Sequence, residues 1–506
     1  MLTVVPPAAV EMAVTSAVAA ARAAQPAWAA TPIGVRVAML ARFHELVYRR
    51  RADIAALVAR ETGKPPLEAL STEIGVVLDD ALFLQRAIPQ HLKSPWFNSA
   101  SRALMRKRLR VVHEPYGVVG VIAPWNYPFM LACARILPAL ATGNAVVFKP
   151  SELTPETGAL TRALLVEAGV PEDVIGLVQG DGAAGAALAA SPVDKVFLTG
   201  STGAGRSVAR ACADRLVPCS LELGGSDPAI VLADADIPTA ASGLVWGRFT
   251  NAGQTCLAPK RIFVETAVYD AFVTAVARAT ATLRVGSAAG ESMDIGAMIA
   301  PRFRTAIENQ LSDAIARGAR IVASAPTVPG SSGDALFAPT VLADVPAGAR
   351  VMTEETFGPL MVIERVSDED EAVARANAGE YGMAASVWTR DSARAGRIAG
   401  RLICGAVSIN EVLVTAGIAE LPHGGVRMSG YGRVHGSAGI ADCVRTKGIV
   451  AERFPGWRQG WWFGYSARSQ AQIDAFIRFA HDPSPLGRLR ALPGVLRLLI
   501  SPDRPV

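Results

Sequence analysis

The sequence predicts an α/β protein with two domains of similar size, each a parallel sheet covered by helices, and a small exposed ribbon. Three observations support this prediction. The chain has 506 residues, which is more than one simple core accommodates. From residue 118 onward, short apolar runs alternate with helical segments. Glycine is abundant (46 residues) while aromatic residues make up only 6%, which suits close helix–sheet packing and glycine-rich turns.

The segment from about residue 14 to residue 88 is expected to form several amphipathic helices. Its apolar side chains recur at helical spacing, and we expect Pro89 to end the last helix. The spacing is carried by Val35, Met39, Leu40, Phe43, Leu46 and Val47. Residues 96–114 then mix cations with apolar residues, as in a two-stranded exposed ribbon; the cations are Arg102, Arg106, Lys107, Arg108 and Arg110.

Strands and helices alternate after the ribbon. Residues 118–122, 145–148 and 195–199 are apolar runs of strand length, and residues 129–141 have the pattern of a helix. A second α/β segment begins after Gly225 with the run 229–232 and continues to about residue 425. Strands that alternate with helices predict a parallel sheet whose ligands bind at its carboxyl edge.

The net charge and the cysteines exclude several classes of protein. Eight Arg and four Asp or Glu in residues 451–506 carry +4 of the net charge of +5, so the rest is almost neutral and no nucleic-acid partner is expected. No Cys/His cluster has zinc spacing, so no metal site is expected. The six cysteines are expected to be reduced thiols, which favours a cytoplasmic location. We expect neither a signal peptide nor a membrane span.

Three turns have the chemistry of a nucleotide or oxyanion site, although each is also compatible with a purely structural role. The run 197–205 (FLTGSTGAG) leads from a strand through a glycine-rich turn into a helix, whose first N–H groups can hold pyrophosphate. Lys149 and Glu152 follow a strand, and Glu152 could accept from a ribose 2′-hydroxyl and repel a 2′-phosphate. Asn126 lies between two prolines in a rigid loop, which suits an oxyanion donor.

A cysteine and a carboxylate complete the candidate chemistry. Cys256 stands in the glycine-led turn GQTC at 253–256, and Glu222 stands beside a Gly-Gly pair in LELGG at 221–225. A lone cysteine is usually a small buried hydrophobe. With a base and a nucleotide site elsewhere in the chain, Cys256 instead fits a covalent nucleophile.

Together these motifs resemble those of the aldehyde dehydrogenase superfamily across roughly residues 15–450. The motifs are PWNYP at 124–128, KPSE at 149–152, FLTGS at 197–201, LELGG at 221–225, GQTC at 253–256, EETFGP at 354–359 and PHGG at 422–425. The resemblance implies two doubly wound domains: a modified Rossmann cofactor domain (1–95 and 115–224) and a catalytic domain (225–426). It also implies an oligomerisation ribbon at 96–114 and 427–450, followed by a tail extension at 451–506.

The resemblance also implies a reaction and a set of residues. Cys256 would attack an aldehyde to form a thiohemiacetal and then a thioester, Asn126 would hold the oxyanion, and Glu222 would be the general base for hydrolysis to a carboxylic acid. NAD is the implied cofactor, with NADP as the alternative. The implied cofactor contacts are Trp125, Lys149, Ser151, Glu152, Gly200, Ser201, Gly205, Glu355 and Phe357.

Several alternatives stay open on the sequence. A coenzyme A-acylating or semialdehyde-specific dehydrogenase is the enzymatic alternative, and a non-catalytic nucleotide-binding protein on this fold is the alternative of another class. Three departures from the family pattern stand out: His423 replaces the common Phe of PFGG, Ser226 replaces a Lys or Asn, and the N-terminus is short. The short N-terminus favours a homodimer over a tetramer.

The tail beyond residue 450 needs its own explanation. Helical patterns at about 466–480 and 486–500 follow an aromatic cluster of Trp457, Trp461, Trp462, Phe463 and Tyr465, and we expect Pro493 to interrupt the second helix. The tail is expected to pack on a partner subunit or to cover the substrate tunnel. Peripheral contact with a membrane is the alternative.

Overall fold

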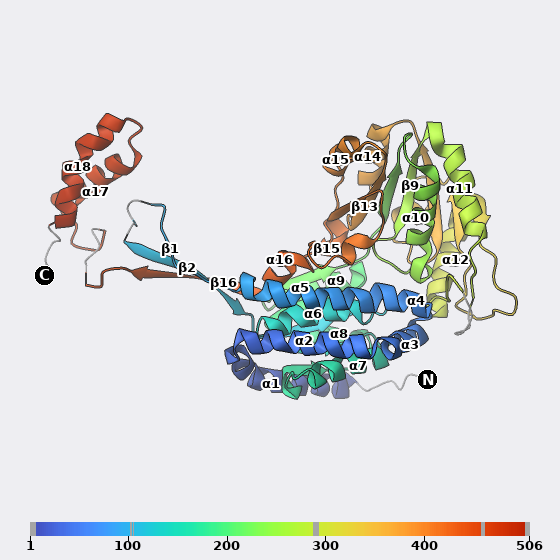
Figure 1. Ribbon diagram of the computed structural model, residues 1–506, viewed down its shortest axis with the longest axis horizontal. Coiled ribbons are helices and arrows are strands. Elements are labelled where there is room, and N and C mark those ends of the chain that lie inside the picture. Colours follow the sequence, from blue (N-terminus) through green and yellow to red (C-terminus); the bar gives the residue numbers. More distant parts are fainter. Residues whose placement is uncertain (1–6, 102–103, 105, 287–292, 457–460, 501–506) are drawn as a thin grey trace. The chain divides into compact units, whose positions relative to one another are not determined.

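The computed structural model describes residues 7–101, 104, 106–286, 293–456 and 461–500 (Figure 1). Arg102 and Trp457 lie outside these residues. The chain divides into two compact units, the first formed by residues 1–91 and 115–445 and the second by residues 92–114 and 446–506. No helix among the described residues is long and apolar enough to cross a bilayer.

A six-stranded sheet forms one half of the first unit. Its order is β15-β7-β6-β3-β4-β5, and all neighbours are parallel except β15, which is antiparallel to β7. The three apolar runs predicted as parallel strands are confirmed as β3, β4 and β6. The bounds are β3 (Val118–Ile122), β4 (Ala145–Lys149), β5 (Ile175–Leu177), β6 (Lys195–Thr199), β7 (Cys219–Glu222) and β15 (Gly430–Tyr431).

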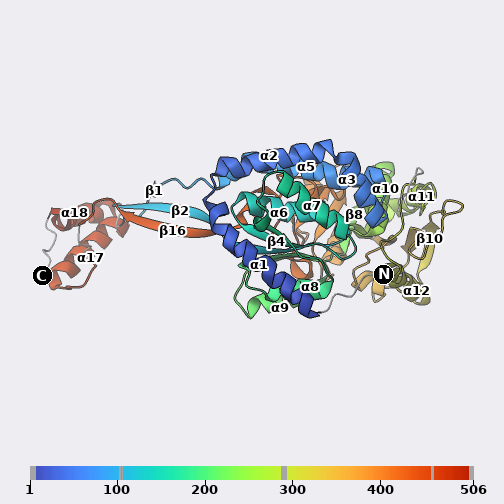
Figure 2. The same ribbon diagram turned by 90° about the horizontal axis from the view of Figure 1, so that it is seen from below.

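Helices cover both faces of this sheet (Figure 2). One face carries α1 (Pro7–Ala30), α8 (Gly182–Ala190) and α9 (Thr202–Ala213). The other carries α6 (Met130–Ala141) and α7 (Pro155–Glu167), over which lie α2 (Ile33–Arg49), α3 (Arg51–Thr62) and α5 (Val76–His91). Between α3 and α5 the chain forms α4 (Pro66–Ala69) and a π-helical turn, η1 (Leu70–Gly75).

The expected N-terminal helices are confirmed, with two differences. Met39, Leu40, Phe43 and Val47 are buried as the spacing predicts, whereas Val35 is half exposed. The prediction that Pro89 ends the last helix is wrong, because α5 continues to His91. A proline removes one N–H donor and crowds the preceding turn, but only two residues of α5 follow Pro89, so the loss is confined to the end of the helix.

A seven-stranded sheet forms the other half of the first unit. Its order is β10-β11-β12-β9-β8-β13-β14, parallel throughout except for β10. The run 229–232 lies in or directly after β8, as predicted. The bounds are β8 (Asp227–Val231), β9 (Pro259–Glu265), β10 (Arg320–Ser324), β11 (Thr340–Ala343), β12 (Leu360–Val366), β13 (Ala384–Trp388) and β14 (Ala406–Ile409).

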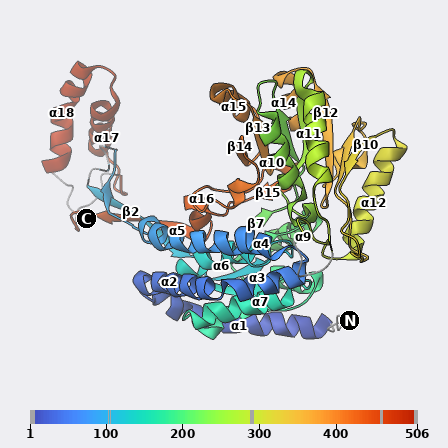
Figure 3. The ribbon, with the colours of Figure 1, turned by 45° about the vertical axis from the view of Figure 1, so that its right-hand side comes forward.

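Each face of this second sheet has its own apolar cluster, because successive side chains of a strand point to opposite faces. Ala229 and Val231 pack with α10 (Ile237–Phe249), α11 (Tyr269–Ala281) and α12 (Pro301–Ala316). Ile230 and Leu232 pack with α14 (Glu369–Asn377) and α15 (Ser392–Ala399) on the other face (Figure 3). The remaining short helices are η3 (Glu172–Val174), η4 (Thr250–Gly253), η5 (Thr266–Val268), α13 (Arg350–Thr353), η6 (Val414–Ala416), η7 (Arg427–Ser429) and α16 (Gly436–Ala441).

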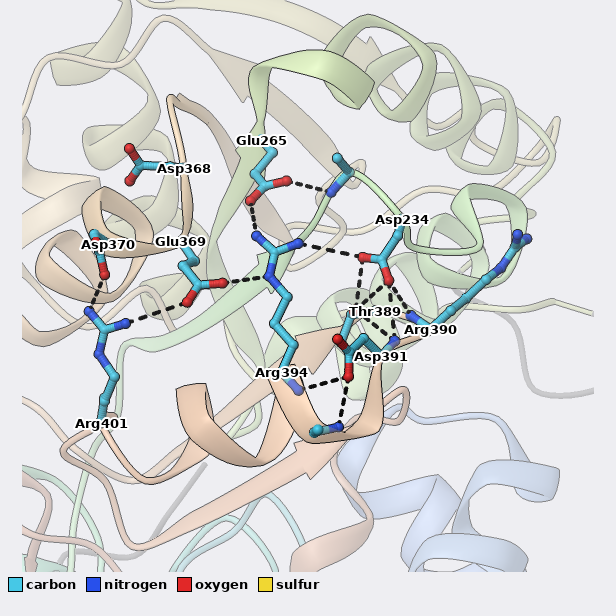
Figure 4. Close-up of polar contacts among 12 residues, drawn as sticks. Asp234, Glu265, Asp368, Glu369, Asp370, Thr389, Arg390, Asp391, Arg394 and Arg401 are labelled. Carbon is cyan, nitrogen blue, oxygen red and sulfur yellow. Dashed lines mark hydrogen bonds and ion pairs between the residues drawn. The ribbon is translucent and has the colours of Figure 1, made fainter.

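A network of charges fixes α14 and α15 to the carboxyl-end loops of the second sheet (Figure 4). Arg394 on α15 donates to Glu369 at 2.5 Å and to Glu265 at 2.6 Å, and it lies 3.8 Å from Asp234. Asp234 also accepts from the Thr389 hydroxyl. Because Arg394 is partly buried and joins several carboxylates, this network holds geometry better than a single exposed ion pair would.

Among its described residues the second unit contains three strands, two from the predicted ribbon at about 96–114 and one that begins in the segment 427–450, which the family resemblance paired with it. They are β1 (Phe97–Asn98), β2 (Lys107–Pro115) and β16 (Val444–Glu452), with β2 in the middle. Lys107 pairs with Glu452 at 2.6 Å, and Lys447 pairs with Glu114. Of the segment 427–450, only residues 446–450 belong to this unit.

Two helices of the tail complete the second unit. They are α17 (Ala467–His481) and α18 (Pro485–Ile500). The prediction that Pro493 interrupts the second helix is wrong, because α18 runs through it. At Gly494 a side chain would collide with Ala475, so the glycine allows the two helices to approach closely here.

Candidate active site

The predicted nucleophile and base lie on one cavity of the first unit. Cys256 follows η4, Glu222 is the last residue of β7, and both line a cavity of about 380 Å³. Glu222 is buried, and Arg135 from α6 lies 3.4 Å from its Oε1. That oxygen accepts no hydrogen bond from the described residues. The structure therefore places the Cys256 thiol and a carboxylate with one oxygen that accepts no hydrogen bond from the described residues on the wall of the same cavity.

Burial dominates the protonation of both groups. It raises the pKa of the Cys256 thiol to about 12, although Lys260 opposes the shift. It also raises the pKa of Glu222, with Arg135 acting in the opposite direction. Without bound molecules, Cys256 is therefore a thiol at neutral pH, and it needs a base to become a nucleophile.

The turn before Cys256 is held in an unusual backbone conformation. Asn251, Ala252 and Gly253 all have positive φ, at 53°, 52° and 71°. A side chain at residue 253 would collide with the carbonyl of Gly358, so glycine is required there on steric grounds as well. Strain of this kind persists only where the surroundings over-determine it.

Two buried cations hold this turn through carbonyl groups. Arg248 of α10 donates to Gly253 O at 3.2 Å, Leu360 O at 2.9 Å and Thr356 O at 3.1 Å, and also to Gly358 O. Lys260 donates to Cys256 O at 2.7 Å and to Thr255 O at 3.1 Å. Burial lowers the pKa of Arg248 to about 9. Arg248 therefore joins the cysteine turn to the EETFGP segment, and Lys260 fixes the carbonyls on either side of the Thr255–Cys256 bond.

The predicted oxyanion donor, Asn126, lies beside the cysteine turn. Its Nδ2 donates to Gln254 O at 3.0 Å, and its carbonyl accepts from Asn251 Nδ2 at 2.9 Å. The same carbonyl accepts from Lys64 Nζ at 2.8 Å. Its neighbour Tyr127 has its hydroxyl 2.8 Å from Thr255 Oγ1.

A fully buried ion pair anchors the loop that carries Asn126. Lys64 Nζ lies 2.7 Å from Glu73 Oε1, and neither side chain is exposed. Glu73 Oε2 accepts from the backbone N–H of Phe129 at 2.8 Å and of Met130 at 3.3 Å, where α6 begins. Glu73 lies in the π-helical turn η1, a distortion that is common at functional sites.

Most of the predicted cofactor contacts gather at the carboxyl ends of β4 and β6. Lys149 ends β4, and its Nζ lies 3.8 Å from Glu152 Oε2; Ser151 Oγ donates to the same carboxylate at 3.3 Å. Gly200 follows β6, and Ser201 caps α9 by accepting from Ala204 N at 3.2 Å. Gly205 lies one turn further, where a side chain would overlap Leu223.

Of the remaining predicted contacts, Glu355 and Phe357 come from the other half of the unit, whereas Trp125 follows β3 of the six-stranded sheet. Glu355 accepts from Gly225 N at 3.0 Å, and a side chain at Gly224 would overlap its carboxylate. Trp125 lies edge-on to Phe357, with ring centroids 5.5 Å apart. Three features of this region are compatible with a bound dinucleotide. They are the glycine-rich turn before α9, the buried Lys149, and the close packing of Glu355 against Gly224.

The cavity beside Cys256 is mainly apolar. None of the described residues that line it is Lys or Arg, and its carboxylate is Glu222. The apolar lining comes from Val76, Met130, Leu131, Leu223, Trp246, Leu257, Met383, Leu413, Val414, Ala416 and Ile418. Such a lining favours binding of an uncharged molecule.

His423 and Ser226, two of the positions that depart from the family pattern, are both buried. His423 lines the cavity and is buried, which lowers its pKa to about 3 and keeps the imidazole neutral. Its Nδ1 has no hydrogen-bond partner among the described residues. Ser226 is also buried, and its carbonyl accepts from Arg261 at 2.8 Å.

Sequence reasoning missed the charged residues that support the site. Lys64, Glu73, Arg135, Arg248 and Lys260 were not among the predicted residues. One signal was available: Arg248 stands between Trp246 and Phe249 in a helix that is otherwise apolar or small. A cation in that setting is expected to be buried and bonded. The partners of Lys64, Glu73 and Arg135 include groups far away in the chain, such as Asn126, Phe129 and Glu222. Among the described residues, Lys260 bonds only backbone carbonyls nearby, which no side-chain pattern marks.

Comparison with known proteins gives consistent matches. Residues 3–449 match the pattern of the aldehyde dehydrogenase family. The chain is 37% identical to 4,4'-diapolycopene aldehyde oxidase of Methylomonas sp., over 90% of this chain and 84% of that protein. It is 36% identical to the NADP(+) succinate-semialdehyde dehydrogenase of Escherichia coli K12, over 85% and 88%. The crystal structure of Mycobacterium tuberculosis aldehyde dehydrogenase complexed with NAD+ superposes with a TM-score of 0.82 at 33% identity, covering 91% of this chain and 92% of the other.

The buried thiol leads to a prediction about reactivity. We expect the alkylation rate of Cys256 by iodoacetamide to rise about tenfold per pH unit between about pH 7 and pH 10, because only the thiolate reacts and its pKa lies near 12. Cys219 should react faster than Cys256 at neutral pH, because a hydrogen bond from Cys212 lowers the pKa of the Cys219 thiol. Peptide-resolved mass spectrometry of the protein without added nucleotide measures both rates. A plateau for Cys256 below about pH 9 would contradict the burial argument.

Proposed function

The chain belongs to the aldehyde dehydrogenase family and is an NAD(P)-dependent oxidoreductase of aldehydes, and we propose that it oxidises an uncharged apolar aldehyde to a carboxylic acid. Cys256 is the proposed nucleophile, Glu222 the general base and Asn126 the oxyanion donor. The observation that carries the proposal is the cavity itself, which brings Cys256 and Glu222 together in an apolar lining without Lys or Arg among its described residues.

The first step forms a bond between Cys256 Sγ and the carbonyl carbon. Because the Cys256 pKa lies near 12, the thiol proton must be taken by a base as the bond forms. Glu222 is suited to this, because burial raises its pKa and one of its oxygens is free to accept. The product of this step is a thiohemiacetal with a negative oxygen.

Asn126 is placed to stabilise that oxygen. Its Nδ2 now donates to Gln254 O, two residues before the nucleophile, and could donate to the oxyanion together with the Cys256 backbone N–H. The loop around Asn126 does not need to reorganise, because Lys64 and Asn251 both bond its carbonyl.

Residues at the carboxyl edge of the first sheet are proposed to hold the cofactor. Lys149, Ser151 and Glu152 would hold the adenosine ribose, and Gly200, Ser201, Gly205 and Trp125 would hold the phosphates. Glu355 and Phe357 would hold the nicotinamide ribose. When bound, NAD(P) accepts the hydride that leaves the carbon attached to Cys256, which becomes a thioester.

Glu222 favours hydrolysis of that thioester over its transfer to coenzyme A. After it has released the thiol proton to solvent, it acts again as a base and takes a proton from the attacking water. The bond to Cys256 Sγ then breaks, the sulfur takes a proton back, and the acid is released. A coenzyme A-acylating enzyme does not need a base at this position. The intact chemical set of Cys256, Glu222 and Asn126 also argues against a non-catalytic role.

The cavity argues for an apolar substrate over a semialdehyde that carries a carboxylate. A carboxylate buried without a cation loses its hydration and gains nothing in exchange. The relative named for 4,4'-diapolycopene aldehyde supports an apolar substrate, whereas the relative named for succinate semialdehyde supports the alternative.

We assign residues 1–95 and 115–224 to cofactor binding and residues 225–426 to the aldehyde chemistry. Residues 96–114 and 427–450 are assigned to association of two copies, together with the tail. The tail exposes large apolar side chains, including Phe463 (84% exposed), Tyr465 (70%) and Leu489 (65%). Apolar exposure of this extent favours burial against a second copy, with a membrane surface as the alternative.

Replacing Glu222 tests its role as a base in both halves of the reaction. We expect Glu222→Gln to lower steady-state turnover by about 10²- to 10⁴-fold, the usual contribution of a general base. The burst of NAD(P)H that precedes hydrolysis should slow as well, because Glu222 is also the proposed acceptor of the Cys256 proton. Stopped-flow absorbance measures the burst, and Cys256→Ala should abolish both phases. Strict dependence of turnover on coenzyme A would overturn the hydrolytic assignment.

Substrate choice is predicted from the cavity. We expect kcat/KM for unbranched aldehydes to rise about threefold to fourfold per added methylene until the cavity is full. Butanal should exceed succinate semialdehyde, which has a carboxylate in place of the methyl group, by at least about 100-fold. Initial rates over an aldehyde panel test both expectations. Equal use of this matched pair would contradict an apolar site.

A chain that ends at Pro455 tests the role of the tail. We expect sedimentation equilibrium to give a dimer for the full chain and at least about tenfold weaker association for the shortened one, because it loses apolar interface area. Both chains should stay in solution when mixed with phosphatidylcholine–phosphatidylserine vesicles. If only the full chain pelleted with vesicles while both formed equal dimers, the tail would be a membrane contact.

A further inference from the structure

Glu152, at the edge of the proposed cofactor site, lies between two cations from different parts of the first unit. Lys149 Nζ is 3.8 Å from its Oε2, and Arg302 Nη2 is 4.0 Å from its Oε1. Lys149 belongs to the same half of the unit as Glu152. Arg302 comes from the other half, as the second residue of α12. No sequence motif pointed to it.

Aromatic contacts connect Arg302 with the rest of the proposed cofactor site. Its guanidinium lies over the ring of Phe303, 4.8 Å from the centroid. Phe303 packs on Trp125 with centroids 4.7 Å apart, and Trp125 lies edge-on to Phe357. The guanidinium is therefore stacked beside this row of rings, although its side chain remains 60% exposed.

The two charges at this edge recognise different chemical groups. A carboxylate such as Glu152 accepts hydrogen bonds from ribose hydroxyls and repels a phosphate. A guanidinium presents a planar fork of donors that matches a phosphate. Lys149 is the poorer phosphate ligand of the two cations, because its side chain is almost fully buried and burial lowers its pKa.

We propose that Arg302 is a specificity-determining residue that binds the 2′-phosphate of NADP, so that this chain accepts NADP as well as NAD. Glu152 then sets a moderate preference for NAD instead of excluding NADP. This inference rests on the proposed function, which places the adenosine ribose at Lys149 and Glu152. Exposed ion pairs add little stability, so Arg302 can leave Glu152 for a phosphate at small cost.

The test measures nucleotide binding and does not depend on turnover. Dissociation constants of NADH and NADPH for the full-length protein are obtained from nicotinamide fluorescence. We expect Arg302→Gln to weaken NADPH binding about tenfold, the loss of one charge-assisted contact, and to change NADH binding less than about twofold. Glu152→Gln should strengthen NADPH binding about tenfold, because it removes the repulsion.

Arg304→Gln is the matched control. Arg304 lies on the same helix, two residues further, and pairs with Glu308 at 2.8 Å. Its loss removes the same charge from α12 but leaves Glu152 untouched, so both dissociation constants should stay unchanged. The effect of Arg302→Gln should also shrink as salt rises, because the contact is exposed.

Three outcomes would overturn the inference. Equal weakening of NADH and NADPH by Arg302→Gln would mean that the residue supports the site without reading the phosphate. Binding of NADH but not NADPH by the unsubstituted chain would mean that Glu152 excludes the phosphate. Binding of neither nucleotide would overturn the cofactor assignment in the proposed function and this inference with it.

Discussion

The candidate site depends on the buried ion pair between Lys64 and Glu73. Each partner also bonds a backbone group of the site, since Lys64 donates to the carbonyl of Asn126 and Glu73 accepts from the first N–H groups of α6. Burying an ion pair costs desolvation free energy, which the attraction between the two charges offsets. Removing one partner leaves the other charge buried without compensation, and this typically destabilises a protein by about 3–5 kcal/mol. Because the pair is the meeting point of η1, the Asn126 loop and α6, its geometry decides where the oxyanion donor lies.

The turn before Cys256 is the complementary constraint. Left-handed backbone at Asn251 and Ala252 costs about 1–2 kcal/mol for each residue. Bonds from Arg248 to four carbonyls and from Asn251 to the Asn126 loop offset this strain. The strained turn and the rigid loop therefore support one another, and neither conformation is explained by its own local sequence.

The sequence predicted what depends on local pattern and missed what depends on distant partners. The strands at 118–122, 145–149 and 195–199 follow from apolar runs, and the glycine turns follow from motif spacing. The predictions that Pro89 and Pro493 end or interrupt a helix were wrong, because both helices continue through the proline. The partners in two ion pairs are too far apart in the chain for a local pattern to predict them. Lys64 and Glu73 are separated by 9 positions, and Arg302 and Glu152 by 150.

The absence of cations from the described lining of the cavity also bears on how a catalytic cycle ends. An uncharged aldehyde enters at little cost, but on the proposed chemistry the product is a carboxylic acid, which is ionised in water at neutral pH. The resulting anion has no positive partner in the lining and lies near Glu222, a second carboxylate. Ionisation would therefore weaken binding of the product to the cavity, so that the product leaves without a conformational change dedicated to its release.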